Sequence, residues 1–286
     1  MTVDPIVALE SLGYTEREAS FLYLVAVHSG YFLRRQFDYF IDRNKGSIVM
    51  RLLEKARVAG HIELLDTTHR RQVYHLFYKP IYRLIGAPNS QNRRVKGDAD
   101  VRARLMKLDY VLENDHEHYL ENDAEKLEYL AQTRGVASEI LVTSNGTLRP
   151  EIRSLLVSVA DRTRPATSLV RFMFIDEGLL TTNKFGRVLA ALSAVMRAVA
   201  HFELIYVATS DHNFREAAAL FHKTFAAAPP QRQQPLDPEW TRTDQKLSQL
   251  TPPFHPQFTT VLLRFSYPSF QRNEPHGSRH GSEVVQ

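Results

Sequence analysis

The chain has 286 residues, no cysteine and a net charge of +4, and 43% of its residues are hydrophobic. This length and apolar content allow one large or two ordinary domains with buried cores, and the lack of cysteine excludes disulfides and thiolate metal sites. The sequence contains no run of 18 apolar residues, so no membrane-spanning helix is predicted. Residues 1–12 lack the basic start of a signal peptide. The sequence therefore predicts a cytoplasmic protein with no membrane partner.

The charge is unevenly distributed along the chain. Residues 1–96 carry 15 Lys and Arg against 9 Asp and Glu, a net charge of +6. Residues 97–134 carry 5 against 10, a net charge of −5. A basic module next to an acidic one is typical of a protein whose first part binds nucleic acid.

The first predicted helices follow a capping box. Thr15 and Glu18 have the spacing in which each side chain bonds to the backbone of the other, and the apolar run 21–27 continues the helix. Gly30 ends this helix, and residues 32–37 are expected to open a second one. A polar turn at residues 44–47 precedes the third helix, with Ser47 as its expected N-cap.

The third helix leads into a predicted hairpin. Ile48, Leu52, Leu53 and Ala56 share one face of this helix, and Gly60 stands where a C-terminal glycine ends a helix. Two β-like runs, 61–66 and 72–78, follow and are joined by the basic segment 67–71. Three helices, a glycine stop and a basic hairpin predict a winged helix-turn-helix, a fold that usually binds DNA.

The remaining elements predict a connector and an α/β domain. Residues 87–97 are polar and rich in turn formers, so we expect a linker. Two helices are expected within 98–133, the second capped by Asn122 or Asp123, and the period then changes to strands and helices. The order from residue 124 is α-β-β-β-α-β and then α, with strands at 139–143, 154–160, 168–175, 201–209 and 258–265 and helices at 183–200 and 214–225.

The fold class is therefore α+β, with four predicted regions. These are a winged helix-turn-helix (1–96), a helical connector (97–134), an α/β domain (135–269) with a Pro-rich insertion (226–256), and a disordered tail (270–286).

Two segments carry a resemblance to a known family. The basic wing and strand at 70–76, and the run 172–178 followed by Thr181, Thr182 and Phe185 and the strand 204–209, resemble the replication-relaxation protein family, which includes MobC-like plasmid mobilisation accessory proteins. The resemblance covers about residues 14–225. It implies a DNA-binding protein of plasmids or mobile elements, whose C-terminal domain resembles a degenerate PD-(D/E)xK nuclease. The chain departs from the family at Phe174, where the family commonly has a carboxylate.

Nine residues are predicted to contact DNA. An arginine on the third helix can read guanine in the major groove, and basic residues at a wing tip reach phosphates or the minor groove. The alternative for each is an ordinary solvated surface. The predicted residues are Lys45, Ser47, Arg51 and Lys55 on or before the third helix, His69, Arg70 and Arg71 at the wing tip, and Arg34 and Arg35 at the start of the second helix.

No catalytic, metal or cofactor site is predicted. Nuclease chemistry needs two carboxylates holding a divalent metal ion and usually a lysine, and Asp161, Asp176, Glu177 and Lys184 are the sole candidates. No lysine stands two positions after Glu177. The alternative is that Asp176 caps a turn in which Gly178 makes the bend. The acidic and histidine side chains at 115–118 are not expected to bind a metal ion together. Successive residues on a helix point in different directions, so these side chains do not converge on one point.

Three functions are weighed. The first is a non-enzymatic protein that binds double-stranded DNA and acts in replication, mobilisation or transcription regulation, with a relaxase, a replication protein or a second copy of the chain as further partners. The second is a metal-dependent nuclease or other DNA-processing enzyme. The third is a winged-helix module for protein–protein interaction.

Overall fold

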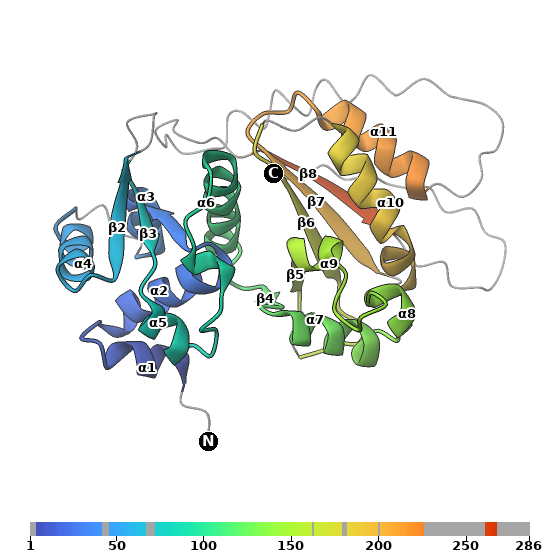
Figure 1. Cartoon of the computed structure of the whole chain (residues 1–286). Coiled ribbons are helices and arrows are strands. Elements are labelled where there is room, and N and C mark those ends of the chain that lie inside the picture. The colour runs from blue at the N-terminus through green and yellow to red at the C-terminus, as the bar shows by residue number, and fades with distance from the viewer. Residues whose placement is uncertain are drawn as a thin grey trace, which may run out of the picture. The chain divides into compact units, whose positions relative to one another are not determined.

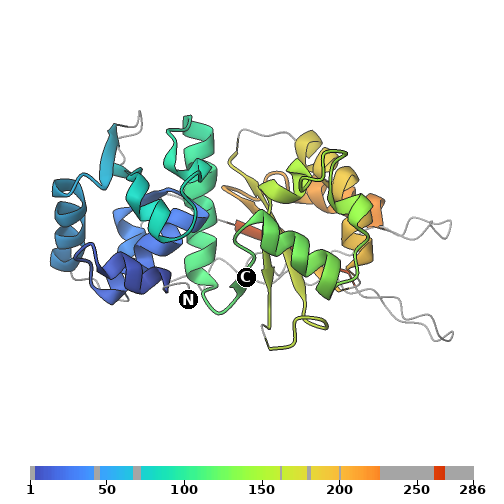
Figure 2. The ribbon, with the colours of Figure 1, turned by 60° about the horizontal axis from the view of Figure 1, so that its bottom comes forward.

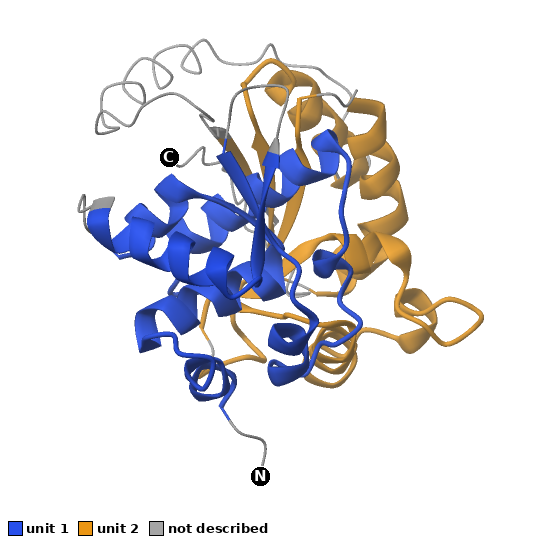
Figure 3. Cartoon of the chain, turned by 60° about the vertical axis from the view of Figure 1, so that its left-hand side comes forward, with its two compact units in different colours: residues 1–117 blue, residues 118–286 orange. Residues whose placement is uncertain are grey.

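The chain forms two compact units of mixed α+β structure. The computed structural model describes residues 4–41, 46–66, 72–161, 163–178, 182–199, 201–225 and 261–267. Unit 1 spans Met1–Glu117 and unit 2 spans His118–Gln286 (Figure 3). The Pro-rich segment 226–256 and the tail 270–286 lie outside the described residues.

Unit 1 combines helices with a three-stranded antiparallel sheet of order β1-β3-β2 (Figure 1). The helices pack against the sheet around a core that contains Phe21, Phe32 and Phe37. The elements are α1 (Pro5–Glu10), α2 (Glu16–His28), β1 (Tyr31–Leu33), α3 (Arg34–Phe40), α4 (Gly46–Val58), β2 (Ile62–Asp66), β3 (Gln72–Leu76), α5 (Lys79–Leu84), the 3₁₀ helix η1 (Gln91–Arg93) and α6 (Asp98–Glu113).

Local signals set the start of α2 and the end of α4. The capping box is present: the Glu18 amide donates to the Thr15 hydroxyl at 3.4 Å, and the Thr15 amide donates to the Glu18 carboxylate at 2.9 Å. Helix α4 ends in a Schellman motif. Gly60 has a φ of +68°, and the amides of Gly60 and His61 donate to the carbonyls of Arg57 and Ala56. These two predictions from sequence are confirmed.

One predicted helix start is a strand in the structure. Residues 32–37 were expected to open a helix, but Phe32 and Leu33 belong to β1, and the helix begins at Arg34. Phe32 pairs with Tyr74 of β3, and Leu33 pairs with Val73. Pairing with a strand about forty residues away satisfies the backbone of these residues, and no local pattern reveals such a partner.

The predicted linker is an ordered strap on unit 1. The Asn92 side chain donates to the carbonyls of Ala26 and Val27 at 2.9 and 2.7 Å, which caps the end of α2. The Tyr31 hydroxyl donates to the Arg94 carbonyl at 2.9 Å. Residues 87–97 are therefore held on unit 1 by partly buried hydrogen bonds. The predicted connector 97–134 does not form a separate region. Its first helix, α6, packs on α2 and α3 of unit 1, and the helix that follows lies in unit 2.

Unit 2 is built on a five-stranded sheet of order β4-β5-β6-β7-β8. Strands β6 and β7 are parallel, and the other neighbouring pairs are antiparallel. Its elements are β4 (His118–Tyr119), α7 (Asp123–Glu128), the π-helical turn η2 (Tyr129–Thr133), α8 (Ser138–Leu141), α9 (Pro150–Ser154), β5 (Leu156–Val159), β6 (Val170–Asp176), α10 (Thr182–Ala198), β7 (Phe202–Ala208), α11 (Phe214–Phe225) and β8 (Val261–Tyr267).

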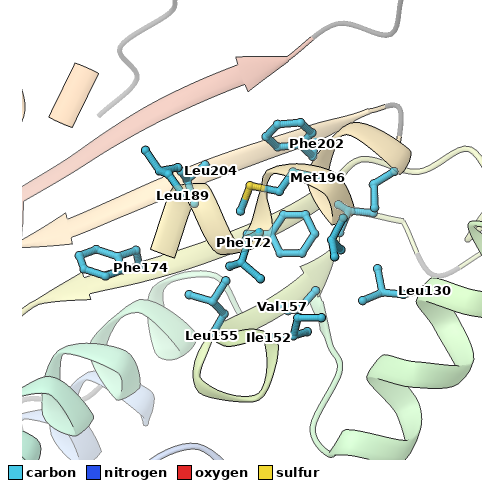
Figure 4. Packing of buried hydrophobic residues seen from close by; sticks show 14 of the residues in the cluster. Leu130, Ile152, Leu155, Val157, Phe172, Phe174, Leu189, Met196, Phe202 and Leu204 are labelled. Carbon is cyan, nitrogen blue, oxygen red and sulfur yellow. The ribbon is translucent and has the colours of Figure 1, made fainter. Parts of the chain in front are cut away.

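Helices α10 and α11 lie side by side over one face of this sheet (Figures 1 and 2). Alternate residues of the central strands point toward them, so that Phe172 and Leu204 meet Leu189 and Met196 in the core (Figure 4). This alternation is the two-residue period that strands impose on side chains.

The predicted strand at 139–143 is wrong. Residues 138–141 form α8, whose Leu141 is fully buried in the core. The position beside β5 is taken by β4, in which His118 pairs with Val159. The second connector helix is capped as predicted, because the Asn122 side chain accepts from the Glu125 amide at 3.0 Å.

A buried lysine ties α7 to the segment before β5. Lys126 is 6% exposed, and its ammonium donates to the carbonyls of Ile152, Arg153 and Leu155 at 3.4, 3.1 and 2.7 Å. Burial lowers the pKa of Lys126 from 10.5 to about 8, while the charge of Asp123 opposes the fall and that of Arg153 adds to it. Between these two values the unfolded chain binds more protons than the folded protein, so folding becomes more favourable as pH rises.

We therefore expect the free energy of unfolding to increase by about 2 kcal/mol between about pH 7 and about pH 9.5. Urea denaturation followed by circular dichroism measures it. Lys126→Met should remove the increase, whereas Lys184→Met, at an exposed position, should retain it. A wild-type stability that stays level over this window would contradict the assignment.

Candidate nucleic-acid interface

Helix α4 and the β2–β3 hairpin form the region that the sequence predicts to bind DNA. The hairpin is antiparallel and in register up to Asp66 opposite Gln72, so residues 67–71 connect the two strands. His69, Arg70 and Arg71 belong to this connection and lie outside the described residues, as does Lys45 before α4. The contacts predicted for these four residues therefore remain predictions.

Helix α4 has one buried face and one exposed face. Val49, Leu52, Leu53 and Ala56 are buried in the core, and Ile48 is partly buried against it. The exposed face has mixed chemistry: Glu54 pairs with Arg57 at 3.1 Å, and Met50 and Val58 are 51% and 75% exposed. The exposed positions are Ser47, Met50, Arg51, Glu54, Arg57 and Val58.

Two of the predicted contact residues, Ser47 and Arg51, are exposed on α4. Ser47 is not the N-cap that the sequence predicted, because the helix begins one residue earlier, at Gly46. Helix starts are the least certain part of a sequence pattern. Arg51 projects from the exposed face, where a guanidinium has the geometry to bind a base edge or a phosphate.

Lys55 is held by an internal contact. Its ammonium lies 2.5 Å from the Glu18 carboxylate, donates to the Gly13 carbonyl at 3.1 Å and sits 5.5 Å from the centre of the Tyr14 ring. The Tyr14 hydroxyl in turn hydrogen-bonds the His61 imidazole at 2.6 Å. This contact joins α4 to the start of α2, and the predicted DNA contact of Lys55, whose side chain is 37% exposed, remains a prediction.

The same group of contacts fixes the base of the hairpin. His61, directly before β2, is buried and stacks on the Tyr78 ring with 4.5 Å between ring centres. Burial lowers the pKa of His61, which favours the neutral imidazole. Burial raises the pKa of Tyr14, and the charge of Glu18 adds to the effect. The hairpin is therefore anchored by a neutral hydrogen bond as well as by apolar packing.

Arg35 also forms an ion pair inside unit 1. Its guanidinium makes two parallel hydrogen bonds to the Asp109 carboxylate, at 2.8 and 2.6 Å, and Gln36 donates to the same carboxylate at 2.8 Å. Asp109 is 7% exposed. A bidentate pair with a buried acid fixes α3 against α6. The Arg35 side chain is 36% exposed, and its predicted phosphate contact remains a prediction. Arg34 stays exposed, with a loose 3.7 Å pair to Asp38.

The sequence prediction missed Arg17, which lies with Arg51 at a hollow beside α4. The hollow has a volume of about 250 Å³ and is lined by apolar and charged side chains, two of them arginines. Arg17 stands in the first turn of α2, outside the predicted helix-turn-helix pair, so no motif points to it. The lining residues are Thr15, Arg17, Glu18, Phe37, Ile41, Ile48 and Arg51.

In unit 2, Asp176 sits in a closed hydrogen-bond network at the end of β6. It is 2% exposed and accepts from the Tyr206 hydroxyl at 2.6 Å, the Asn213 amide group at 3.0 Å and the Gly178 backbone amide at 2.9 Å. Burial and this carboxylate raise the pKa of Tyr206. Gly178 has a φ of +84°, and a side chain there would meet the Thr209 hydroxyl. Asp176 therefore caps the turn that Gly178 makes.

Of the other candidate nuclease residues, Glu177 directly follows Asp176 and is 7% exposed, whereas Asp161 lies far from Asp176. Asp161 follows the hairpin end of β5, so the strand β6 separates it from Asp176. A strand of that length spans roughly 20 Å. Lys184 is exposed on α10, and Phe174 packs on the rings of Phe185 and Tyr206. Among the residues that the structure describes, no three His, Asp or Glu side chains are placed to hold a metal ion.

Comparisons with known proteins give no relative for this chain: no family model, no curated protein and no solved structure matches it. None of the helices within the described ranges has the length and apolar character needed to span a membrane.

Proposed function

We propose that the chain is a non-enzymatic DNA-binding protein whose unit 1 is a winged helix-turn-helix. The observation that carries the proposal is the element order α2-β1-α3-α4-β2-β3, in which α4 ends in a glycine cap and leads directly into an antiparallel hairpin. In this fold the third of the three helices, here α4, enters the major groove, and the hairpin contacts the DNA backbone beside it.

The charge of the module supports a phosphate-rich ligand. Residues 1–96 have a net charge of +6. We assign DNA contact to Arg51 on α4, to exposed Arg34, and to Lys45, His69, Arg70 and Arg71, and we add Arg17. Arg35 and Lys55 hold the module together through Asp109 and Glu18.

For unit 2 we propose a degenerate nuclease-like domain that does not cut nucleic acid. Its mixed sheet with a parallel β6–β7 pair and its α10 crossover support the likeness to the PD-(D/E)xK fold. The separation of Asp161 from Asp176 argues against metal-dependent cleavage, which needs convergent carboxylates. Together with the resemblance to the replication-relaxation family, these features support a role in plasmid or mobile-element replication, mobilisation or transcription control, where a relaxase or replication protein is the expected partner.

The full chain should bind duplex DNA, with an affinity that falls steeply as salt increases. Each phosphate contact contributes about 0.9 to the slope of log affinity against log salt. Arg70→Ala with Arg71→Ala should weaken binding to all sequences alike, whereas Arg51→Ala should cost about 1–3 kcal/mol on a preferred site. Arg83→Ala, which removes an exposed cation from α5, serves as the matched control. Fluorescence anisotropy at several salt concentrations measures these effects.

Absence of binding at low salt would refute the proposal and favour the second candidate, a protein-interaction module. The exposed Met50 and Val58 on α4 support that candidate, because exposed apolar side chains on one helix face favour a protein surface. Cleavage of plasmid DNA with Mg²⁺ or Mn²⁺ that disappears in Asp176→Asn or Asp161→Asn would instead establish an enzyme.

A further inference from the structure

The outer face of the α10–α11 layer in unit 2 is strongly basic. Helix α10 contains no acidic residue, and α11 contains Glu216 alone. Lys184 and Arg187 on α10, and Arg215 and Lys223 on α11, are all exposed. None of these four cations has an ion-pair partner among the described residues. Four uncompensated charges on two adjacent helices create a local positive potential.

The surface between these cations is formed by small side chains and has no large hydrophobic residue. The exposed positions of α10 that carry no charge are mostly alanine, and no large apolar side chain of α10 or α11 is exposed. Protein-binding hot spots are enriched in tryptophan and tyrosine as well as arginine, and α10 and α11 contain no tryptophan or tyrosine. Small side chains instead allow an extended backbone to approach closely. The uncharged exposed residues of the two helices are Asn183, Ala190, Ala191, Ala194, Ala198, Ala219 and His222.

The two helices hold this face as one rigid surface. Gly186 of α10 packs against Leu220 of α11, where a side chain would be 3.7 Å from the leucine methyl groups. Arg197 of α10 donates to the Thr224 carbonyl and lies 5.4 Å from the centre of the Phe225 ring. The cations of α10 and α11 therefore keep fixed relative positions, because both helices also bury their other faces in the core.

We propose that the α10–α11 face binds the phosphate backbone of duplex DNA without reading its sequence. The proposal rests on the proposed function of unit 1 for the identity of the ligand, and it gives unit 2 a direct part in DNA binding. Lysine and arginine contacts to phosphate supply affinity and salt dependence but no sequence preference. A face that offers cations and mostly alanines between them fits that kind of contact.

The test compares two triple variants of the full chain that remove equal charge. Lys184→Gln with Arg187→Gln and Lys223→Gln removes three cations from the α10–α11 face. Lys79→Gln with Arg83→Gln and Arg164→Gln removes three exposed cations from elsewhere on the molecule. Glutamine is tolerated well in helices, and Arg164 is exposed in the turn segment between β5 and β6, so both variants should keep the wild-type thermal melt.

The α10–α11 triple variant should lower the slope of log affinity against log salt by about 2–3, equally for all DNA sequences. The control triple variant should keep the wild-type slope to within about 1. If the α10–α11 variant keeps the wild-type slope while Arg70→Ala with Arg71→Ala weakens binding, the inference is wrong and the function of unit 1 stands. An acidic protein partner for this face would give that same result. If the wild-type chain binds no DNA, both proposals fall together.

Discussion

Gly30→Ala should destabilise unit 1 by about 2–5 kcal/mol. Gly30 has a φ of +83°. This left-handed conformation costs an L-residue roughly 1–2 kcal/mol. An added methyl group would also overlap the Asn92 carbonyl oxygen, and overpacking against such a contact costs about 1–3 kcal/mol more. The strap cannot simply move away, because Asn92 is bonded to the carbonyls of Ala26 and Val27.

Gly13→Ala separates the two causes. Gly13 has a φ of +90°, but nothing lies within 4 Å of the position of its added methyl group. We expect it to show the backbone cost alone, about 1–2 kcal/mol. Hydrogen exchange read by mass spectrometry is suitable because the chain has two units: peptides of α2 and β3 should lose protection in Gly30→Ala, and peptides of β6 and β7 should keep theirs. Equal effects of the two substitutions would show that the strap does not approach Gly30.

Leu52→Asp should abolish the folded state of unit 1, with a loss of at least about 4 kcal/mol. Leu52 is fully buried in the core beside Leu53 and Ala56. The substitution removes the burial of a leucine side chain, worth roughly 1.5–3 kcal/mol, and places an unpaired carboxylate among apolar groups, which costs more still. Thermal denaturation followed by circular dichroism should lose one of its transitions or show it at a much lower temperature.

Met50→Asp is the matched control on the same helix. Met50 is 51% exposed. The same new charge therefore meets water there and should change stability by about 0.5 kcal/mol or less. Similar melting curves for the two variants would show that the buried and exposed faces of α4 are assigned incorrectly. The pair therefore tests the face from which Arg51 projects.

The elements that the sequence predicted correctly are those with local causes. The capping box at Thr15 and Glu18 bonds residues three positions apart, and the Gly60 cap bonds residues within one turn of α4. The strands around residues 62–66 and 72–76 follow from their composition and from the polar segment between them. Neighbouring residues alone decide such features, so a single sequence is sufficient to find them.

The candidate site was predicted less well, since a charged residue is free only if nothing distant pairs with it. Arg35 and Lys55 look like surface cations in the sequence, but Asp109 lies 74 positions after Arg35 and Glu18 lies 37 positions before Lys55. Each pairing depends on how helices pack, which no spacing rule reveals. Arg51 and Arg34 are exposed in the structure, and Arg34 makes only a loose 3.7 Å pair with Asp38, four positions further along the same helix.

Local sequence patterns correctly predicted the start of α2, the end of α4, the hairpin that follows α4 and the basic character of the first 96 residues. The tertiary structure decided that residues 31–33 join a sheet, that residues 87–97 form a strap, and that residues 138–141 are helical. The physical reason is the range of the interactions. Caps and turns are satisfied within a few residues, whereas strand pairing, buried ion pairs and core contacts are satisfied by partners that become neighbours only when the chain folds.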